Sequence, residues 1–261
     1  IILEGIERLS IFIAVLVMMI AWELISPRRQ LKQPRLQRWL ANLGLSVLST
    51  LLLRFTIATA AILSATYAGS HGWGILNLIN LPSGLAFILG IVLLDLAIYG
   101  QHRASHQWSW LWRLHKVHHT DLELDVSSAI RFHPIEILLS MCYKSICILI
   151  IGVSPVAVII FEIILSSCAL FNHSNVKLSL ALDKVLRLVL VTPDMHRVHH
   201  SVIQAETDSN YGFSISVWDR LFGSYIDQPK QGHEKMIIGL SQYQKVDDVA
   251  LSRLLLMPFK G

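Results

Sequence analysis

Long apolar stretches constrain the fold of this chain more strongly than any other feature of its sequence. Leu9–Ser26, Trp39–Ala68 and Gly84–Gly100 are apolar over most of their length, and Pro134–Phe171 is long enough to cross a bilayer twice. A helix of about 20 apolar residues spans the hydrocarbon core of a bilayer, where helices satisfy their backbone hydrogen bonds without water. The sequence therefore predicts an all-α, multi-pass transmembrane bundle with about four or five spans.

The composition also indicates that membrane lipid surrounds much of this chain. Of 261 residues, 53% are hydrophobic and 15% are charged, and the mean hydropathy is +0.54. Such values are unusual for a soluble protein. A membrane chain buries its apolar surface against lipid and neighbouring helices, so the size rules for soluble cores do not apply. We expect a single integral-membrane domain over residues 1–261.

The last apolar stretch has the pattern of a helical hairpin. Its centre, Gly152–Pro155, combines glycine, serine and proline, which favour a turn. Lys144 and Glu162 each lie nine residues from Val153 on opposite limbs. Because a charge at membrane depth favours a partner, we hypothesise that these two side chains pair. Independent snorkelling of both side chains is the alternative.

A basic cluster follows the first apolar stretch and contains no acidic residue: Arg28, Arg29, Lys32, Arg35 and Arg38. Loops rich in Lys and Arg beside a span stay cytoplasmic, whereas nucleic-acid binding would require further basic patches interleaved with aromatic residues. The cluster thus predicts an outer amino terminus, a cytoplasmic helical cap and no nucleic-acid partner. Because the charges follow the apolar run, we expect a retained first span rather than a signal peptide.

Three further features concern the apolar part of the chain and its boundary with water. Arg54 interrupts Trp39–Ala68, so we expect the span to occupy the later part of that stretch, with Arg54 snorkelling or facing a partner. Leu178–Leu190 mixes leucine and valine with charged residues, a pattern typical of an amphipathic helix in the interface. The cysteines lie in apolar runs and are expected to pack as small hydrophobic side chains.

Histidines are the candidate functional residues. Eight of the 12 histidines fall in three groups, His102–His106 (HRASH), His115–His119 (HKVHH) and His196–His200 (HRVHH), while His133 and His173 flank the predicted hairpin. Spacings of three and four residues place side chains on one face of a helix. Imidazole suits iron, zinc, copper and nickel, and ten imidazoles exceed the needs of one ion. We therefore predict two metal ions, and regard the remaining two, His71 and His233, as structural or merely exposed.

Other metal sites fit the pattern less well. The chain contains neither HExxH, as in zinc proteases, nor the ExxH pairs of soluble carboxylate-bridged di-iron bundles. A bis-histidine haem would use two ligands inside the spans, and a metal transporter would place its ligands along the membrane path. A redox centre beside the bilayer, facing lipid substrates, is the remaining interpretation.

These motifs resemble the three histidine boxes of the fatty acid hydroxylase and sterol desaturase superfamily. Further segments resemble that family as well: Arg131–Pro134, Asn172–Asn175, Pro193–Met195, Asp208–Gly212 and Trp218–Gly223. Together the resemblance runs from about residue 95 to about residue 225. The three residues between His102 and His106 are more similar to hydroxylases and sterol enzymes than to acyl-CoA desaturases.

The resemblance implies a non-haem di-iron centre that uses O2. Its ligands, carried over from the family, are His102, His106, His115, His118, His119, His133, His173, His196, His199 and His200. The family's activity implies hydroxylation of an unactivated C–H bond in a lipid or sterol. Electrons would come from ferredoxin or a cytochrome b5-like carrier with an NAD(P)H reductase, since no nucleotide-binding glycine motif is visible here. Zinc can replace iron during purification because it binds such sites more tightly.

Residues that orient the ligands can be proposed from their spacing. If the third span continues as helix into the first box, Asp95 and Tyr99 share a face with His102 and His106, and Asp95 could orient a histidine or pair elsewhere, for example with Arg54. Asp208 and Asn210 either support the third box or shape a turn. Thr192 before Pro193 predicts an N-cap for the helix of the third box, and Trp218 and Phe222 are expected in packing or at the membrane interface.

Three functions remain open at the level of the sequence. Lipid or sterol hydroxylation is preferred, and desaturation within the same family is the alternative because the metal ligands do not distinguish the two. A zinc-binding membrane protein without redox activity represents another class. The sequence does not reveal the lipid substrate.

Overall fold

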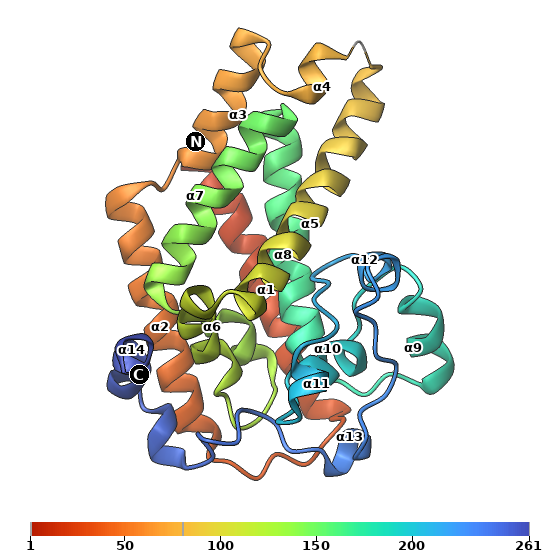
Figure 1. Cartoon of the computed structure of the whole chain (residues 1–261). Coiled ribbons are helices and arrows are strands. Elements are labelled where there is room, and N and C mark those ends of the chain that lie inside the picture. The colour runs from red at the N-terminus through yellow and green to blue at the C-terminus, as the bar shows by residue number, and fades with distance from the viewer. Residues whose placement is uncertain (1, 80, 261) are drawn as a thin grey trace.

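Five long helices form the body of the molecule (Figure 1). The computed structural model describes residues 2–79 and 81–260. The long helices are α1 (Ile2–Ile25), α2 (Arg35–Thr56), α5 (Ser83–Gln107), α7 (Pro134–Ile151) and α8 (Pro155–His173). The described residues form isolated β-bridges but no sheet. The predicted all-α bundle is thus confirmed.

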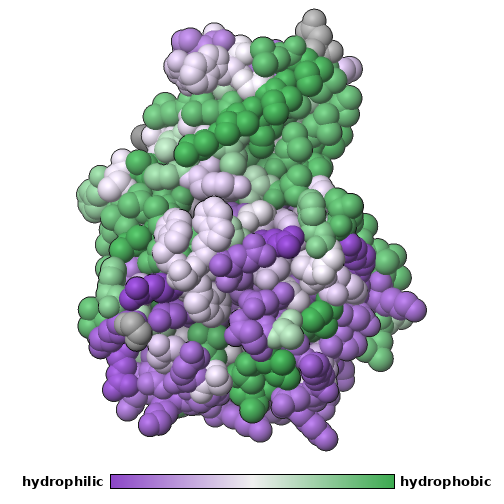
Figure 2. Space-filling model, in the orientation of Figure 1, coloured by the Kyte–Doolittle hydropathy of each residue, from purple (hydrophilic) through white to green (hydrophobic). Residues whose placement is uncertain are grey.

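Each long helix contains a segment that is long and apolar enough to cross a membrane. These segments are Glu7–Ile25, Arg35–Thr56, Ser83–Gln107, Pro134–Ile151 and Pro155–His173. Figure 2 shows that apolar surface predominates over the upper part of the molecule and polar surface over the lower part. Exposed apolar side chains on that scale require an apolar solvent. The chain is a multi-pass membrane protein.

The second apolar stretch differs from its prediction. We expected the span in the later part of Trp39–Ala68, but the helix of spanning length is α2, and the chain leaves it at Ile57 before α3 (Ala60–His71) begins. Arg54 lies exposed in the last turn of α2. The β-branched residues Thr56, Ile57 and Thr59 lower helix propensity at the break, whereas hydropathy alone does not reveal it.

The predicted hairpin is confirmed, and its turn is held by close backbone packing. Gly152 ends α7 with φ 81°, a left-handed conformation that favours glycine. Gly74, just before α4 (Ile75–Leu78), lies against this turn, and a Cβ on Gly74 would come within 2.2 Å of Gly152 N. Ser154 then caps α8, its side chain accepting the Ala157 N–H, with Pro155 at the first helical position.

The two charges of the hairpin meet as hypothesised. Lys144 Nζ donates a hydrogen bond to the Glu162 carboxylate. Arg8 on α1 also donates a hydrogen bond to Glu162. This third partner was not predicted from the sequence. Three spans are therefore joined by charged side chains.

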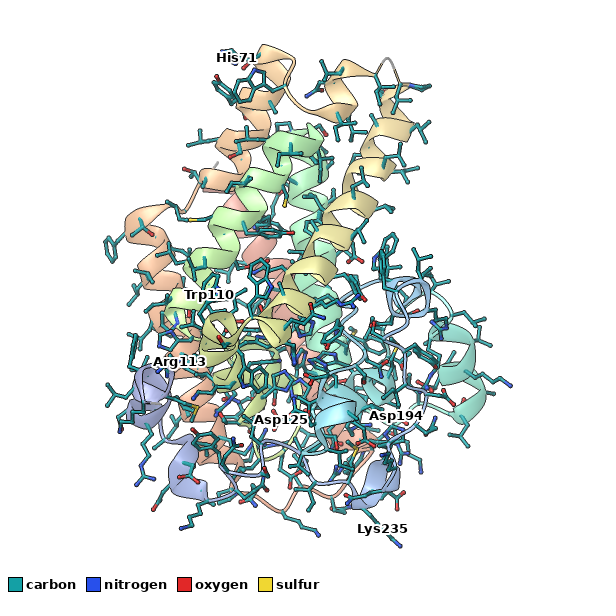
Figure 3. All side chains as sticks on the ribbon, viewed as in Figure 1. His71, Trp110, Arg113, Asp125, Asp194 and Lys235 are labelled. Carbon is teal, nitrogen blue, oxygen red and sulfur yellow. The ribbon has the colours of Figure 1, made fainter. Side chains whose placement is uncertain are left out.

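Short helices gather at one end of the bundle and form a cap. They are α6 (Ser109–His119), η1 (Val126–Ile130), α9 (Leu180–Leu186), α10 (Pro193–His199), α11 (Gln204–Thr207), α12 (Val217–Leu221), α13 (Gly232–Lys235), η2 (Val246–Val249), α14 (Leu251–Leu256) and η3 (Met257–Phe259). The basic linker between α1 and α2 lies at the same end, whereas His71 lies at the opposite end (Figure 3). The cap and the basic linker thus share one side of the bundle.

A buried ionic network fastens the cap to α2. Arg38 donates to the Asp121 carboxylate at 2.6 Å and to the Asp125 carboxylate at 2.8 Å. Asp121 also accepts a hydrogen bond from Ser128 Oγ at 2.7 Å. Arg38 is 1% exposed and both carboxylates are fully buried. Such a network is stabilising only while each charge keeps its partners, so it fixes the loop after α6 in one position.

Candidate metal centre

The three histidine motifs lie on three helices that meet beneath the spans. As predicted, α5 continues through the first box and carries His102 and His106, while α6 carries the second box. The helix α10 carries the third box, and His173 is the last residue of α8. Thr192 caps α10 as predicted, because its side chain accepts the Met195 N–H.

Nine histidines form two groups in which the ring nitrogens face one another. The first group is His102, His106, His115, His119 and His199, and the second is His118, His173, His196 and His200. In each group one nitrogen from every ring lies within 4.8 Å of the others. The first group draws on all three boxes, and the second combines the second and third boxes with His173, so the folded chain rather than any single box assembles the sites.

The second group has a particularly compact geometry. His173 Nε2 lies 3.1 Å from His118 Nε2 and 3.1 Å from His196 Nε2, and His200 Nε2 lies 3.2 Å from His196 Nε2. Two neutral imidazoles can share one proton between two nitrogens, but further nitrogens at the same point have no proton to accept. A cation at this point would satisfy their lone pairs.

Burial favours the neutral form of five imidazoles in the second and third boxes. Desolvation, followed by the charges of neighbouring imidazoles, lowers the pKa of His118, His119, His196 and His200 well below the ordinary value. Burial likewise lowers the pKa of His199 to about 3. A neutral imidazole is the form that binds a metal ion.

Six of the nine rings have a hydrogen-bond acceptor at Nδ1. His102, His118, His173 and His199 contact backbone carbonyls of Tyr211, Arg131, Ala169 and Ser209 at 2.6–3.2 Å, and two rings contact carboxylates: His115 with Glu136 at 2.6 Å and His106 with Asp208 at 3.2 Å. An acceptor at Nδ1 fixes the proton on that nitrogen and leaves the Nε2 lone pair free.

The free nitrogens fit metal ions. The Nε2 atoms of His102, His106, His115 and His199 are buried and have no hydrogen-bond partner among the described residues. A buried polar atom without a partner is costly in a folded protein. These four Nε2 atoms converge, and the tautomer of each ring is fixed. They therefore match the donor set of a transition-metal site.

His133, the tenth predicted ligand, is not brought into either group. Its Nδ1 accepts the Ile135 N–H at the start of α7, and its Nε2 lies 3.3 Å from the Leu255 carbonyl. The ring thus caps a helix and contacts the carboxy-terminal segment. His71 is exposed and stacks on Tyr67, while His233 is buried beside Asp194. The structure places neither in the two groups.

Asp95 and Tyr99 occupy other places than the spacing suggested. Asp95 accepts the Trp218 indole N–H at 2.8 Å and the Ile215 N–H at 3.2 Å, so it holds the loop before α12 rather than a histidine. Tyr99 bonds Ser224 Oγ at 2.9 Å and stacks on Phe222. Among the described residues, neither side chain forms a hydrogen bond with a ring of the first box.

Asp208 and Asn210 both support the boxes. Asp208 is the carboxylate partner of His106. Asn210 adopts a left-handed φ of 48° and donates from Nδ2 to the Met195 carbonyl within α10. Asn210 therefore shapes a turn and supports the third box, which the sequence had presented as alternatives.

Sequence reasoning missed Glu136 and the backbone carbonyls. Glu136 is an acidic residue in the first turn of an otherwise apolar helix, and this unusual placement is the signal that could have found it. A carbonyl carries no such signal, because every residue has one. The folded loops alone decide which carbonyl reaches a ring.

A small cavity of about 160 Å3 adjoins the first group. His102 and His115 form one wall, and the remaining lining is mostly apolar: Ile98, Phe132, Ile137, Leu165 and Phe213, with Gln101, Ser105, Glu136 and Ser140. These residues come from the lower turns of α5, α7 and α8 and from two loops. A hydrocarbon group can therefore lie beside His102 and His115 against mostly apolar side chains.

Comparison with known proteins places this geometry in a family. The family model for fatty acid hydroxylases matches residues 87–224, the segment that holds all nine grouped histidines. An ornithine lipid hydroxylase, OlsE, from Rhizobium tropici is 32% identical over 150 residues, which cover 57% of this chain and 44% of that protein. No solved structure shows a significant match.

Two eukaryotic relatives match the same region. Human alkylglycerol monooxygenase is 30% identical over 172 residues, covering 65% of this chain and 36% of that protein. Sphinganine C4-monooxygenase 1 from Arabidopsis thaliana is 25% identical over 143 residues, covering 54% of each chain. The match thus spans about half or less of each relative's length. The family match extends over more than half of this chain, from the third span to the turn after α12, and the chain belongs to the fatty acid hydroxylase family.

Proposed function

We propose that this protein is a membrane di-iron monooxygenase that hydroxylates a C–H bond of a lipid. The observation that carries the proposal is the convergence of nine buried imidazoles into two adjacent groups. Family membership supports the reaction class, because the relatives are named as hydroxylases and monooxygenases. Residues 1–261 would act as a single membrane domain.

The two groups would hold one iron each. His102, His106, His115, His119 and His199 would hold the first ion, and His118, His173, His196 and His200 the second. When bound, the iron pair supplies the redox chemistry that activates O2 towards an unactivated C–H bond. Glu136 and Asp208 would orient their rings, and the buried carbonyls would orient the others.

The site favours an apolar reacting group. Only the first group contributes to the wall of the neighbouring cavity, through His102 and His115, so the oxidised carbon would lie on that side. The apolar lining binds a hydrocarbon segment and excludes water from it. The relatives that act on ornithine lipid, alkylglycerol and sphinganine support a lipid as the substrate class.

The reaction requires electrons that this chain does not carry. A monooxygenase places one oxygen atom in the product and reduces the other to water, so electrons and protons come from outside. We expect ferredoxin or a cytochrome b5-like protein, with an NAD(P)H reductase, to dock on the cap. The basic linker that lies beside the cap supports a cytoplasmic position for the histidines.

Lipid mass spectrometry tests the reaction. Cells that express the chain should contain a lipid that has gained one oxygen atom, and cells that express His119→Ala should lack it. A lipid that has lost two hydrogen atoms would instead identify a desaturase. Purified protein should contain iron and consume O2 when a reductant is supplied.

A zinc protein without redox activity makes the opposite prediction. Protein from iron-supplemented cells would then contain zinc alone, would consume no O2, and would leave the lipids unchanged. Iron supplementation is needed because zinc binds such ligands more tightly than Fe(II) when both are present. This combination of results would contradict the proposed function.

A further inference from the structure

Three ionisable side chains meet far from the histidines. Glu162 on α8 accepts hydrogen bonds from Lys144 on α7 and from Arg8 on α1. Glu162 is 8% exposed, Lys144 11% and Arg8 36%. Glu162 stands about 16 Å along α8 from His173, a member of the second histidine group, at 1.5 Å per residue. We refer to these three residues as the charged cluster.

The charged cluster carries an excess positive charge. Among the side chains that the structure describes, two cations contact Glu162, whereas one would balance its charge. Arg8 lies at the end of the apolar segment Glu7–Ile25, where a long side chain can extend towards water. The guanidinium instead points into the bundle and contacts Glu162. A net charge inside a membrane domain is costly unless a counter-charge joins it, so the cluster is suited to an additional anion.

The charged cluster lines a cavity that leads towards the metal centre. This cavity has a volume of about 350 Å3, and α1, α2, α7, α8 and the loops beneath them form its walls. Four residues line both this cavity and the small cavity beside His102: Phe132, Ile137, Leu165 and Phe213. The two cavities are therefore adjacent. An elongated molecule that extends through both would have one end at the charged cluster and the other beside His102.

The lining of the larger cavity suits an anionic lipid. Apolar side chains such as Leu53, Met141 and Ala169 accompany four hydroxyl groups, those of Ser46, Ser49, Thr50 and Ser166. Ser49 and Ser166 donate to the Phe132 and Ile163 carbonyls, whereas the hydroxyl groups of Ser46 and Thr50 can donate hydrogen bonds to anionic oxygens. The cations add charge-assisted bonds, which are stronger. A lipid without an anionic group would need neither the hydroxyl groups nor the cations.

We propose that the charged cluster is a subsite for the anionic group, a carboxylate or a phosphate, of the lipid substrate. Lys144 and Arg8 bind the anion, and Glu162 holds both cations in position. The hydrocarbon chain of the lipid then passes Phe132 and Phe213 and ends beside His102. Oxidation consequently falls on a carbon remote from the anionic group. The inference rests on the proposed function, because it treats the cavity beside His102 as the place of reaction.

Equilibrium binding to the full chain in detergent tests the subsite. The probes are palmitate, hexadecyl phosphate and hexadecanol, which share one chain and differ in the charge of the end group. The wild type should bind at least one of the two anions about tenfold or more tightly than hexadecanol, since hydrogen bonds to charged groups exceed those to neutral ones. The tighter of the two anions identifies the subsite as one for a carboxylate or for a phosphate.

Variants distinguish a binding role from a structural one. Lys144→Met and Arg8→Gln should each remove most of the preference for the anion, and Lys144→Arg should keep it. Arg8→Gln leaves the buried Lys144–Glu162 pair intact, so it remains informative even where Lys144→Met unfolds. Arg54→Gln is the matched control, because Arg54 is an exposed arginine of a spanning helix outside the cavity lining.

Equal binding of the three probes by the wild type would overturn the inference. An anion preference that survives in both Lys144→Met and Arg8→Gln would overturn it as well. The assay uses no iron, O2 or electron donor, so it gives the same answer whether or not the protein proves to be a hydroxylase. Conversely, a hydroxylase without anion preference would retain the proposed function and lose only the subsite.

Discussion

At the scale of single residues, the partners of the imidazoles determine which nitrogen is free for a metal ion. Most of these partners are backbone carbonyls, whereas His115 has the Glu136 carboxylate at 2.6 Å. Glu136 is largely buried, with 11% of its side chain exposed. A carboxylate raises the basicity of the ring and fixes its orientation. His115 should therefore be the ligand most sensitive to replacement of its partner.

Replacement of Glu136 by glutamine tests this role. Glu136→Gln keeps an acceptor near Nδ1 but removes the charge, and we expect iron affinity to fall about tenfold or more. Iron titration of the purified protein measures the change. Glu234→Gln serves as the control, since Glu234 is an exposed carboxylate of the cap. Equal iron affinity in the wild type and Glu136→Gln would contradict the role.

The buried position of Asp219 leads us to expect that the stability of the protein depends on pH. Its carboxylate accepts the N–H groups of Tyr211 and Gly212 and the Ser224 hydroxyl. Burial raises the pKa of Asp219 from 3.8 to about 6. Because folding raises this pKa, the protonated form is favoured by folding, and the contribution of Asp219 to stability is lost as the pH rises from about 4 to about 6.

Thermal unfolding in detergent across that range measures this contribution. The stability of the wild type relative to Asp219→Asn should decrease with rising pH by on the order of 2 kcal/mol, and it should be constant above about pH 6. The comparison between the two proteins cancels the titration of other groups. A pH-independent difference would show that the carboxylate is ionised throughout.

Residue types reveal ligands more readily than they reveal the partners of ligands. The spacing of the histidine boxes predicted that their eight rings converge, because i to i+3 and i to i+4 positions share a helix face, and the structure groups these eight rings with His173. The same argument left Asp95 two possible partners, a histidine or a group elsewhere in the molecule, and the structure shows the second. Helix periodicity gives the direction of a side chain but not its partner, and for Asp95 the loop that carries Trp218 supplies that partner.

At the scale of elements, capping residues explain why the boxes are presented rigidly. Thr192 accepts the Met195 N–H with Pro193 at the first helical position, so α10 begins at a defined residue directly before the third box. Every residue of α10 is buried. The start of this short helix therefore fixes the positions of His196 and His199.

Removal of the Thr192 N-cap should lower both the stability of the protein and its affinity for metal. Thr192→Ala should cost about 1 kcal/mol of stability, as loss of an N-cap usually does, and should also lower iron content. Ser179→Ala is the matched control, because Ser179 caps α9, which carries no histidine. Thermal unfolding and metal analysis of both variants separate the effects. Similar iron contents in the two variants would contradict the positioning role of Thr192.

Helices were easier to predict than their interruptions. Proline and glycine marked the turn at Gly152 and the start of α10, and both predictions are confirmed. The break between α2 and α3 at Ile57 contains neither residue type, so the sequence gives only the weak signal of β-branched side chains. Packing of α3 against α7 and α8 compensates for this break, and such tertiary contacts are not readable from local sequence.

At the scale of the whole molecule, the exposed apolar surface positions the cap against the bilayer. Apolar residues of α9 and the segment after it are strongly exposed, among them Leu180 at 79%, Val185 at 64% and Leu188 at 60%. This agrees with the amphipathic interfacial helix that the sequence predicted. Trp108 and Trp110, at the junction of α5 and α6, are also exposed, and tryptophan favours the membrane interface. These exposed apolar residues support a position of the two histidine groups close to the membrane surface.

Labelling of single cysteines tests on which side this surface lies. In a variant without the native cysteines, Ser70→Cys and Lys245→Cys place thiols at opposite ends of the molecule. A membrane-impermeant maleimide added to intact cells should label Ser70→Cys and leave Lys245→Cys unlabelled until the cells are opened. The reverse pattern would contradict a cytoplasmic position for the histidines and for the electron donor.

The central claim is that the two histidine groups bind two iron ions. Anomalous diffraction at the iron absorption edge, recorded from crystals of the iron-loaded protein, tests it most directly. We predict one peak among His102, His106, His115, His119 and His199 and a second among His118, His173, His196 and His200. A single iron peak, or iron bound elsewhere in the cap, would contradict the account.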